Sequence, residues 1–237
     1  CKGGTEQLIE DIRAIIFDFD GLILDTEGPI YQSWRELFAK YDLDFPFSTW
    51  SIFIGTKDVP YGPYDLLEEK LGGKVDRQEL EHKRQQREDA LILEKPIMPG
   101  VERYLQEAHR KGLKLAVASS SSCDWVTGHL DRLGLLSKFV CVKASDDVEV
   151  TKPNPAVYLA ALACLEVKST QAIAIEDSPN GILAAKRAGL TCIAVPNLLT
   201  RQLNLEDADL QLTSLNDLSL GELLAQLSIN GRNRFSG

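Results

Sequence analysis

Two kinds of hydrophobic pattern divide the chain. Beyond residue 100, short apolar runs typical of buried strands alternate with segments whose apolar residues recur every three or four positions, as in amphipathic helices. The apolar runs predict strands at 113–118, 139–142, 171–175 and 191–195, with a short edge strand at 207–212. The periodic segments predict helices at 101–111, 124–133, 155–165, 179–188 and 218–227, and the chain is expected to fray from residue 229.

The segment before residue 97 differs, because helical periodicity fills most of it. An apolar run at 12–17 predicts one strand, helices are expected at 26–41, 65–71 and 76–94, and short helices with a loop at 42–64. Alternating strands and helices build parallel, doubly wound sheets. We therefore predict an α/β fold, a Rossmann-like doubly wound parallel-sheet core of residues 1–26 and 97–237 with an inserted helical cap, or lid, of residues 27–96.

Composition and charge narrow the possible partners. The 237 residues are 44% hydrophobic and 26% charged, which is ordinary for a globular domain, and the formal net charge is −9. That charge argues against nucleic acid or an anionic membrane surface as a partner. No apolar run approaches the roughly 20 residues of a membrane-spanning helix. We expect no nucleic-acid and no membrane partner, while a local cation would still allow an anionic small substrate.

The cysteines and histidines are scattered. There is no Cys-x-x-Cys pair. The cysteines are Cys1, Cys123, Cys141, Cys164 and Cys192, and the histidines are His82, His109 and His129. We expect neither a zinc site nor a disulfide framework from such spacing. Reduced cysteines predict a cytoplasmic protein.

The strand at 12–17 ends on two aspartates, Asp18 and Asp20, followed at once by Gly21. Side chains alternate along a strand, so if Asp18 points into a site, Phe19 points away and Asp20 returns to the same side. Ligands of open parallel sheets bind just beyond the carboxyl ends of the strands. Taken alone, such a pair more often caps a turn than forms a catalytic site, and the rest of the chain decides between these interpretations.

Three later segments place polar side chains after predicted strands, namely Ser119, Lys152 and the pair Glu176-Asp177. In a parallel sheet all of them reach one edge. Clustered carboxylates repel one another and need a cation to persist. Oxygen ligands favour a hard divalent ion, above all Mg²⁺, while a hydroxyl, an ammonium and a helix N-terminus suit phosphate. Together these groups indicate phosphoryl transfer through an aspartyl phosphate.

These residues resemble, in the same order, the four motifs of the haloacid dehalogenase superfamily. The matching segments are Asp18-Phe19-Asp20-Gly21-Leu22-Ile23-Leu24-Asp25-Thr26, Val117-Ala118-Ser119-Ser120, Lys152-Pro153-Asn154-Pro155 and Ile175-Glu176-Asp177-Ser178-Pro179-Asn180-Gly181. The resemblance covers nearly the whole chain, and the helical insertion is similar to that family's cap domain. The most similar subgroup is the β-phosphoglucomutase-like branch of sugar-phosphate phosphatases and mutases.

The resemblance implies catalytic roles for four residues. Asp18 would be the nucleophile that accepts the phosphoryl group. Asp20 would be the general acid that protonates the leaving oxygen, and then the base that activates water or a sugar hydroxyl. Ser119 would hydrogen-bond the phosphoryl oxygens beside Ser120, and Lys152 would neutralise their charge. An aspartate at position 20 favours phosphate chemistry over dehalogenation, because oxygen leaving groups need a proton and halide does not.

The resemblance also implies a Mg²⁺ site. Its ligands would be the carboxylates of Asp18 and Asp177 and the backbone carbonyl of Asp20. Glu176 would be either a further carboxylate at the ion or a residue that only supports the ligands. Structural alternatives remain open for two other residues as well: Ser119 could simply cap the next helix, and Lys152 could be a surface turn residue.

Substrate choice is expected to depend on the cap, where the clues are weaker. The mutase branch implies a Gly-x-Ser-Arg loop, but here Gly55 is followed by Thr56-Lys57-Asp58, which puts mutase activity in doubt although Lys57 could offer a cation. Gly55 and Lys57 are the predicted cap contacts to substrate. Residues that could line the pocket, or equally form the cap's own core or solvated face, are Trp50, Tyr61, Tyr64, Arg84 and Arg87.

We predict a Mg²⁺-dependent phosphatase of the haloacid dehalogenase type. Its substrate would be a small phosphorylated metabolite, a sugar phosphate or a nucleotide-derived phosphomonoester, and the protein would be a monomer or weak homodimer. A phosphomutase of the β-phosphoglucomutase type is the alternative, because it shares the aspartyl phosphate and differs only in the phosphoryl acceptor. A catalytically silent binding protein on the same fold is a third hypothesis, against which the retention of every chemical group argues.

Overall fold

The computed structural model describes residues 12–50 and 61–233, with side chains as far as residue 227. The chain forms two compact units. One runs to Leu24 and resumes at Pro96, and the other is Asp25–Lys95, so the divisions fall within two residues of the predicted boundaries. None of the helices in the described part of the chain is both long enough and apolar enough to span a membrane.

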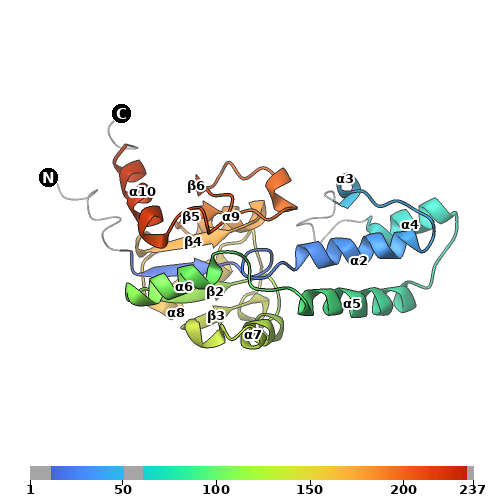
Figure 1. The fold of residues 1–237 in the computed structure, drawn as a ribbon, viewed down its shortest axis with the longest axis horizontal. Helices are drawn as coiled ribbons and strands as arrows, with labels where there is room; N and C mark the ends of the chain where they lie inside the picture. Colours follow the sequence, from blue (N-terminus) through green and yellow to red (C-terminus); the bar gives the residue numbers. More distant parts are fainter. Residues whose placement is uncertain (1–11, 51–60, 234–237) are drawn as a thin grey trace. The chain divides into compact units, whose positions relative to one another are not determined.

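The first unit is built on a six-stranded parallel sheet, ordered β3-β2-β1-β4-β5-β6 (Figure 1). Every pair of neighbouring strands is parallel. The strands are β1 (Ala14–Phe17), β2 (Lys114–Ala118), β3 (Cys141–Lys143), β4 (Ala172–Glu176), β5 (Thr191–Ala194) and β6 (Leu210–Gln211). The predicted Rossmann-like doubly wound α/β fold is therefore confirmed.

Four helices of this unit lie between successive strands along the chain, and a fifth, α10, follows the last strand. They are α6 (Val101–Arg110), α7 (Cys123–Arg132), α8 (Ala156–Leu165), α9 (Pro179–Arg187) and α10 (Leu220–Asn233), with short 3₁₀ turns η1 (Leu136–Lys138), η2 (Ser145–Asp147), η3 (Ser169–Gln171) and η4 (Thr200–Gln202). The prediction that the chain frays from residue 229 is wrong, because α10 continues to Asn233.

The strand order reverses direction between β3 and β4. The chain passes from β1 through β2 to β3 on one side, then crosses back to continue through β4, β5 and β6 on the other. Right-handed crossovers then put α6 and α7, which come before the reversal, on the opposite face of the sheet from α8 and α9. Helix α10, which follows the last strand, packs against α6. The reversal leaves β1 and β4 as neighbours at the point where α/β sheets bind their ligands.

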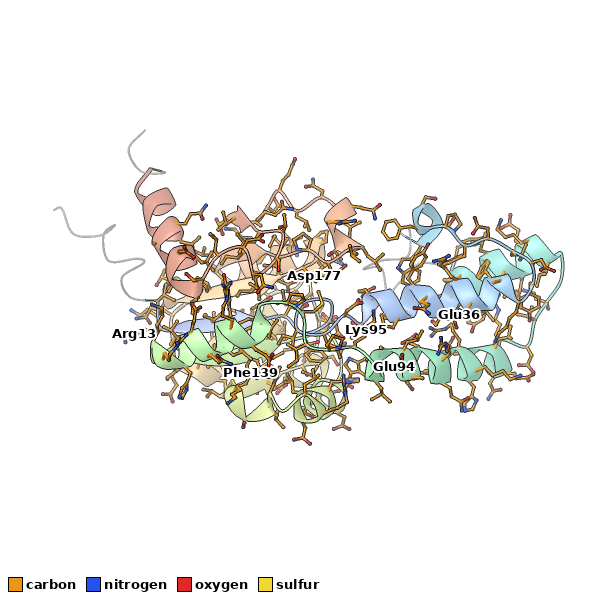
Figure 2. All side chains as sticks on the ribbon, viewed as in Figure 1. Arg13, Glu36, Glu94, Lys95, Phe139 and Asp177 are labelled. Atoms are coloured by element: carbon orange, nitrogen blue, oxygen red, sulfur yellow. A yellow bond between two sulfur atoms is a disulfide. The ribbon has the colours of Figure 1, made fainter. Side chains whose placement is uncertain are left out.

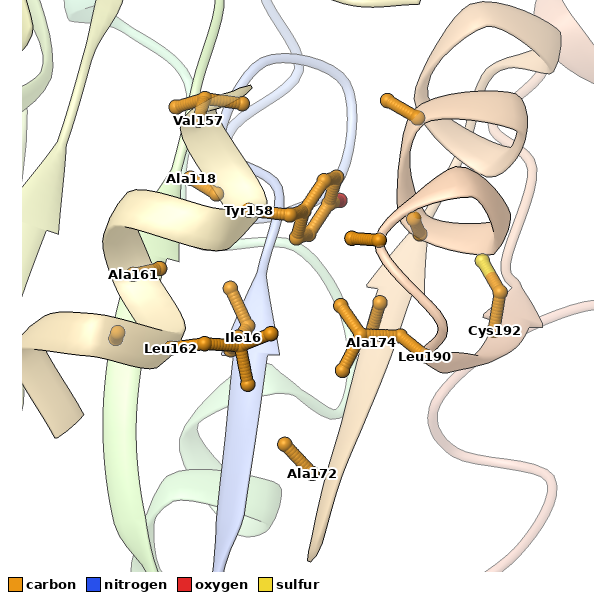
Figure 3. Close-up of a cluster of buried hydrophobic side chains, with 14 of the residues drawn as sticks. Ile16, Ala118, Val157, Tyr158, Ala161, Leu162, Ala172, Ala174, Leu190 and Cys192 are labelled. Atoms are coloured by element: carbon orange, nitrogen blue, oxygen red, sulfur yellow. The ribbon is translucent and has the colours of Figure 1, made fainter. Parts of the chain in front are cut away.

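Burial on both faces explains the uninterrupted apolar run of β1. All four of its residues are fully buried, as is usual for central parallel strands. Ile16 packs in a cluster with side chains of α8 and α9, including Tyr158 and Leu162 (Figure 3). This packing fixes the strand whose last residue precedes Asp18.

In the described residues of the second unit, 25–50 and 61–95, the regular structure is helical, with α2 (Glu27–Ala39), α3 (Phe47–Trp50), α4 (Pro63–Leu71) and α5 (Arg77–Leu93). Helix α2 packs along α5. Aromatic side chains form its centre: the rings of Phe38 and Phe45 lie 4.4 Å apart, and Trp34 and Trp50 also approach Phe45. A small all-helical unit thus gains a core of its own.

One cysteine prediction is wrong. Cys141 on β3 and Cys164 on α8 form a disulfide, whereas Cys123 and Cys192 are free. Their separation of 23 residues carries no signal in the sequence, and they meet only because α8 packs against β3. The prediction of a cytoplasmic protein assumed that the cysteines are reduced, and this assumption does not hold for Cys141 and Cys164.

Candidate active site

The carboxyl ends of β1 and β4 bring three buried carboxylates together. Asp18 follows β1, and its N–H continues the pairing by donating to the carbonyl of Ile175, 2.9 Å away. Glu176 ends β4 and Asp177 follows it at the same edge (Figure 2). Asp18 is 6% exposed, Asp177 2% and Glu176 not at all. Carboxylates at this depth need compensating charge.

Lys152 supplies part of that charge. Its Nζ lies 2.5 Å from Asp18 Oδ1 and 2.6 Å from Glu176 Oε1, so one ammonium joins the two carboxylates. The residue comes from the loop before α8, and its side chain is itself buried. The interpretation of Lys152 as a surface turn residue is therefore wrong.

Glu176 accepts hydrogen bonds on both of its oxygens. Oε1 receives the Tyr158 hydroxyl at 2.6 Å as well as Lys152. Oε2 receives the N–H of Asp177 at 3.2 Å and the hydroxyl of Ser178 at 3.3 Å. Four donors around a fully buried carboxylate hold it rigidly, which in turn orients Lys152.

The buried cluster raises the pKa values of both Asp18 and Lys152, for different reasons. Burial, followed by repulsion from Glu176, raises the pKa of Asp18 to about 8, and the ammonium of Lys152 only partly offsets this. Burial opposes the charge of Lys152, but attraction to Asp18 and Glu176 outweighs it and holds the pKa of Lys152 above its ordinary value. Lys152 is therefore charged at neutral pH, while Asp18 needs further positive charge to ionise fully.

The carboxylates have the donor chemistry of a divalent metal site. Ligand oxygens of Asp18, Glu176 and Asp177 all lie within 4.8 Å of one another. Three anionic oxygens in a buried cluster, with one ammonium beside them, fit a hard cation such as Mg²⁺. Asp20 was predicted to contribute only its backbone carbonyl, and its side chain has other partners.

Asn197 supports this cluster and was missed from the sequence. Its Nδ2 donates to Asp177 Oδ2 at 2.8 Å and to the Gly21 carbonyl at 3.3 Å, while its Oδ1 accepts the N–H groups of Leu199 and Thr200. The residue follows β5, so the strand-end rule that selected the other site residues would have found it. Asn197 fixes the orientation of the Asp177 carboxylate.

Gly21 allows this close approach. Its φ is +80°, and a Cβ there would lie 2.4 Å from Asp177 Oδ2 and 2.7 Å from Asn197 Nδ2. Both the conformation and the space therefore require glycine.

The side chain of Asp20 is held by donors from the segment after β2. Its Oδ2 accepts the Ser121 hydroxyl at 2.7 Å and the Ser119 hydroxyl at 3.2 Å, and its Oδ1 accepts the Trp125 indole N–H at 3.0 Å. Ser119 is fully buried, and the predicted Ser120 lies between the two serines in the turn. The helix is capped by Ser122 rather than Ser119, so the capping alternative for Ser119 is wrong.

The residues of the helical unit that were predicted to line a substrate pocket contact, where the structure describes them, other residues of their own unit. Gly55 and Lys57 lie outside the described residues. Arg84 is buried over the Trp34 ring and pairs with Glu81 and Glu88, which is a structural role inside the unit. The Tyr64 hydroxyl donates to Glu81, the Tyr61 hydroxyl donates to Glu69, and Trp50 joins the aromatic centre. Arg87 pairs with Glu36, which lies on α2 (Figure 2).

Comparisons with known proteins find relatives along nearly the whole chain. A family model described as haloacid dehalogenase-like hydrolase matches residues 15–195. A Bacillus subtilis protein named "Putative phosphatase YhcW" is 44% identical over 217 residues, which cover 92% of this chain and 98% of that protein.

Two solved structures extend the comparison. The structure of CbbY from Rhodobacter sphaeroides in complex with phosphate is 31% identical to this chain and has a TM-score of 0.69. The match covers 90% of this chain and 99% of the CbbY chain. A mutant of CbbY was solved in complex with xylulose-(1,5)bisphosphate. β-Phosphoglucomutase from Clostridium difficile is 26% identical with a TM-score of 0.68, over 93% of this chain and 98% of its own.

Gly181 offers a test of how tightly the cluster is packed. A Cβ on Gly181, in the first turn of α9, would lie 2.0 Å from the carboxylate atoms of Glu176. We expect Gly181→Ala to lower the free energy of unfolding by about 1–3 kcal/mol, because a buried, multiply bonded carboxylate cannot move aside. Urea unfolding followed by circular dichroism measures this.

Gly128 is the matched control, since it also lies in a helix but a Cβ there meets nothing within 4 Å. Gly128→Ala should raise the free energy of unfolding by up to about 1 kcal/mol. Equal effects of the two substitutions would contradict the close packing of α9 against Glu176.

Proposed function

The chain belongs to the haloacid dehalogenase-like hydrolase family, and from that membership we propose that it is a Mg²⁺-dependent phosphatase acting on a small phosphomonoester through an aspartyl phosphate at Asp18. One observation carries the proposal. Lys152 joins Asp18 to Glu176 in a buried cluster that also contains Asp177. The arrangement combines a carboxylate nucleophile, a fixed ammonium and the oxygen ligands of a divalent ion.

In the first half-reaction an oxygen of Asp18 attacks phosphorus. The bond from phosphorus to the leaving oxygen breaks, and Asp20 gives its proton to that oxygen, so an alcohol departs. Lys152, already bonded to Asp18, compensates charge on the attacking carboxylate and on the phosphoryl oxygens. Ser119 donates to those oxygens when its hydroxyl turns from Asp20.

In the second half-reaction a water attacks the phosphorus of the aspartyl phosphate. Asp20, now a carboxylate, takes a proton from that water, and the bond from phosphorus to the Asp18 oxygen breaks. Inorganic phosphate leaves, Asp18 regains its carboxylate and Asp20 its proton. The two half-reactions thus balance, with Asp20 serving once as acid and once as base.

The metal site proposed here comprises Asp18 and Asp177, with the Asp20 backbone carbonyl. Glu176 supports it from outside the ligand set, because its oxygens already accept Lys152, Tyr158 and Ser178. When bound, Mg²⁺ supplies the positive charge that Lys152 alone does not, which neutralises the nucleophile and the phosphoryl oxygens.

We propose a sugar phosphate as the substrate class, with a nucleotide-derived phosphomonoester as the second possibility. The similarity to CbbY, solved with phosphate and with a sugar bisphosphate, supports a phosphorylated sugar. We further propose that the helical unit acts as the cap that selects the substrate, and that the protein is a cytoplasmic monomer or weak homodimer.

Phosphomutase activity is a second candidate because of the similarity to β-phosphoglucomutase. A mutase returns the phosphoryl group from Asp18 to a bound sugar phosphate rather than to water. Lys57 and Asp58 stand where the mutase pattern Gly-x-Ser-Arg has serine and arginine, which favours the phosphatase.

An assay of the purified protein against a panel of phosphomonoesters separates these functions. The panel includes β-glucose 1-phosphate with a trace of the bisphosphate, and both free phosphate and isomerised sugar phosphate are measured. We expect free phosphate from sugar phosphates, no isomerisation, and no turnover after EDTA treatment. Isomerisation without phosphate release would establish the mutase instead, and full activity in EDTA would refute the metal site.

Asp18→Asn should reduce turnover by at least about 10⁴-fold while the protein stays folded, because a neutral amide cannot form the acyl phosphate. Asp131→Asn, an exposed change on α7, is the control and should leave turnover unchanged. Phosphate release and far-ultraviolet circular dichroism are measured on both. Residual activity of Asp18→Asn above a few per cent would remove Asp18 as the nucleophile.

Asn197→Ala should weaken metal binding about 10–100-fold, because Asp177 Oδ2 loses the donor that orients it. Electron paramagnetic resonance of Mn²⁺, with Mg²⁺ as competitor, measures binding without any substrate. Asn204→Ala is the control, since Asn204 only caps an exposed turn. An unchanged affinity in Asn197→Ala would show that Asn197 does not support the ligand.

A further inference from the structure

The hydrogen bonds of Asp20 are unequal in kind. Trp125 donates its indole N–H to Oδ1 at 3.0 Å, while Oδ2 faces two hydroxyls, Ser121 at 2.7 Å and Ser119 at 3.2 Å. An indole N–H can only donate, whereas a serine hydroxyl can donate or accept. The oxygen beside the indole is therefore bound as an acceptor, and the oxygen beside the hydroxyls is free to change its role.

We propose that Trp125 is a positioning residue for proton transfer, and that it holds Oδ1 of Asp20 as an acceptor so that Oδ2 carries the catalytic proton. The inference rests on the proposed function, because it takes Asp20 as the acid and base. Trp125 lies outside the four motifs, near the start of α7.

The ring of Trp125 is itself held in place. Ser122 caps α7 by accepting the backbone N–H of Trp125, and the His129 ring meets the indole edge to face with centroids 4.4 Å apart. His129 in turn stacks on Phe19, the residue between the two aspartates, at 6.3 Å. The same ring stack thus contacts both α7 and the loop that carries Asp20.

The arrangement gives each proton a defined place. In the first half-reaction the proton on Oδ2 moves to the leaving oxygen as the phosphorus–oxygen bond breaks. Asp20 is then a carboxylate whose Oδ1 still accepts from Trp125. In the second half-reaction Oδ2 takes a proton from the attacking water, and the hydroxyl of Ser121 can turn from donor to acceptor beside it.

The test uses the dependence on the leaving group. An alkyl phosphate needs a proton delivered to its leaving oxygen, whereas p-nitrophenolate leaves without one. We expect Trp125→Phe to lower kcat/KM about 10-fold or more for an alkyl sugar phosphate and less than about 3-fold for p-nitrophenyl phosphate, because acid catalysis contributes about 10²–10⁴-fold. Trp125→Leu, which also has no side-chain donor, serves if Trp125→Phe does not fold. Equal losses on both substrates would overturn the inference.

Two further variants separate the possible causes. Asp20→Asn should show the same selective loss, but larger; if it does not, Asp20 is not the acid and the proposed mechanism fails. A selective loss in Asp20→Asn but not in the Trp125 variants would refute only the role of Trp125. His129→Phe keeps the indole N–H and an aromatic ring beside it but removes the acceptor of the Arg132 Nε–H, so any loss that it causes without breaking the bond from Trp125 to Asp20 should be equal for the two substrates.

Discussion

The ion pair of Lys152 with Asp18 and Glu176 is the interaction on which the site depends. Two carboxylates at this depth could not stay close without a cation between them, since desolvation and mutual repulsion act together. The ammonium is held in turn by the fixed position of Glu176, which Tyr158 and the start of α9 enclose. The packing of α8 and α9 against the sheet is therefore also what positions the charges.

The topology explains why these groups meet. Residues from the ends of β1 and β4, the turn after β2, the loop before α8 and the turn after β5 converge at the reversal of strand order. Parallel strands deliver their carboxyl ends to one edge, so each polar residue placed after a strand adds to the same site. The chain needs no long-range sequence signal to gather them.

That rule also sets the limit of prediction from the sequence. The hydrophobic periodicity was sufficient to predict the strands of the sheet and the helices beside it. The rule that polar residues after strands form the site was sufficient to predict that Asp18, Lys152, Glu176 and Asp177 lie together. The sequence did not predict Tyr158 and Trp125 as site residues, because both lie within helices. There the sequence pattern of an aromatic residue that only packs in the core is the same as that of one that also donates a hydrogen bond. The disulfide was not predicted because the spacing between Cys141 and Cys164 does not show that α8 packs against the edge strand β3.

The position of β1 also has a consequence for synthesis of the chain. β1 is the most completely apolar strand, yet its neighbour β4 is completed about 160 residues later, at Glu176. At about 5–20 residues per second, one side of this strand waits roughly 8–30 seconds for its partner on the ribosome. The strand that the finished sheet buries most deeply is thus the one that the nascent chain must shield longest from other unfolded chains.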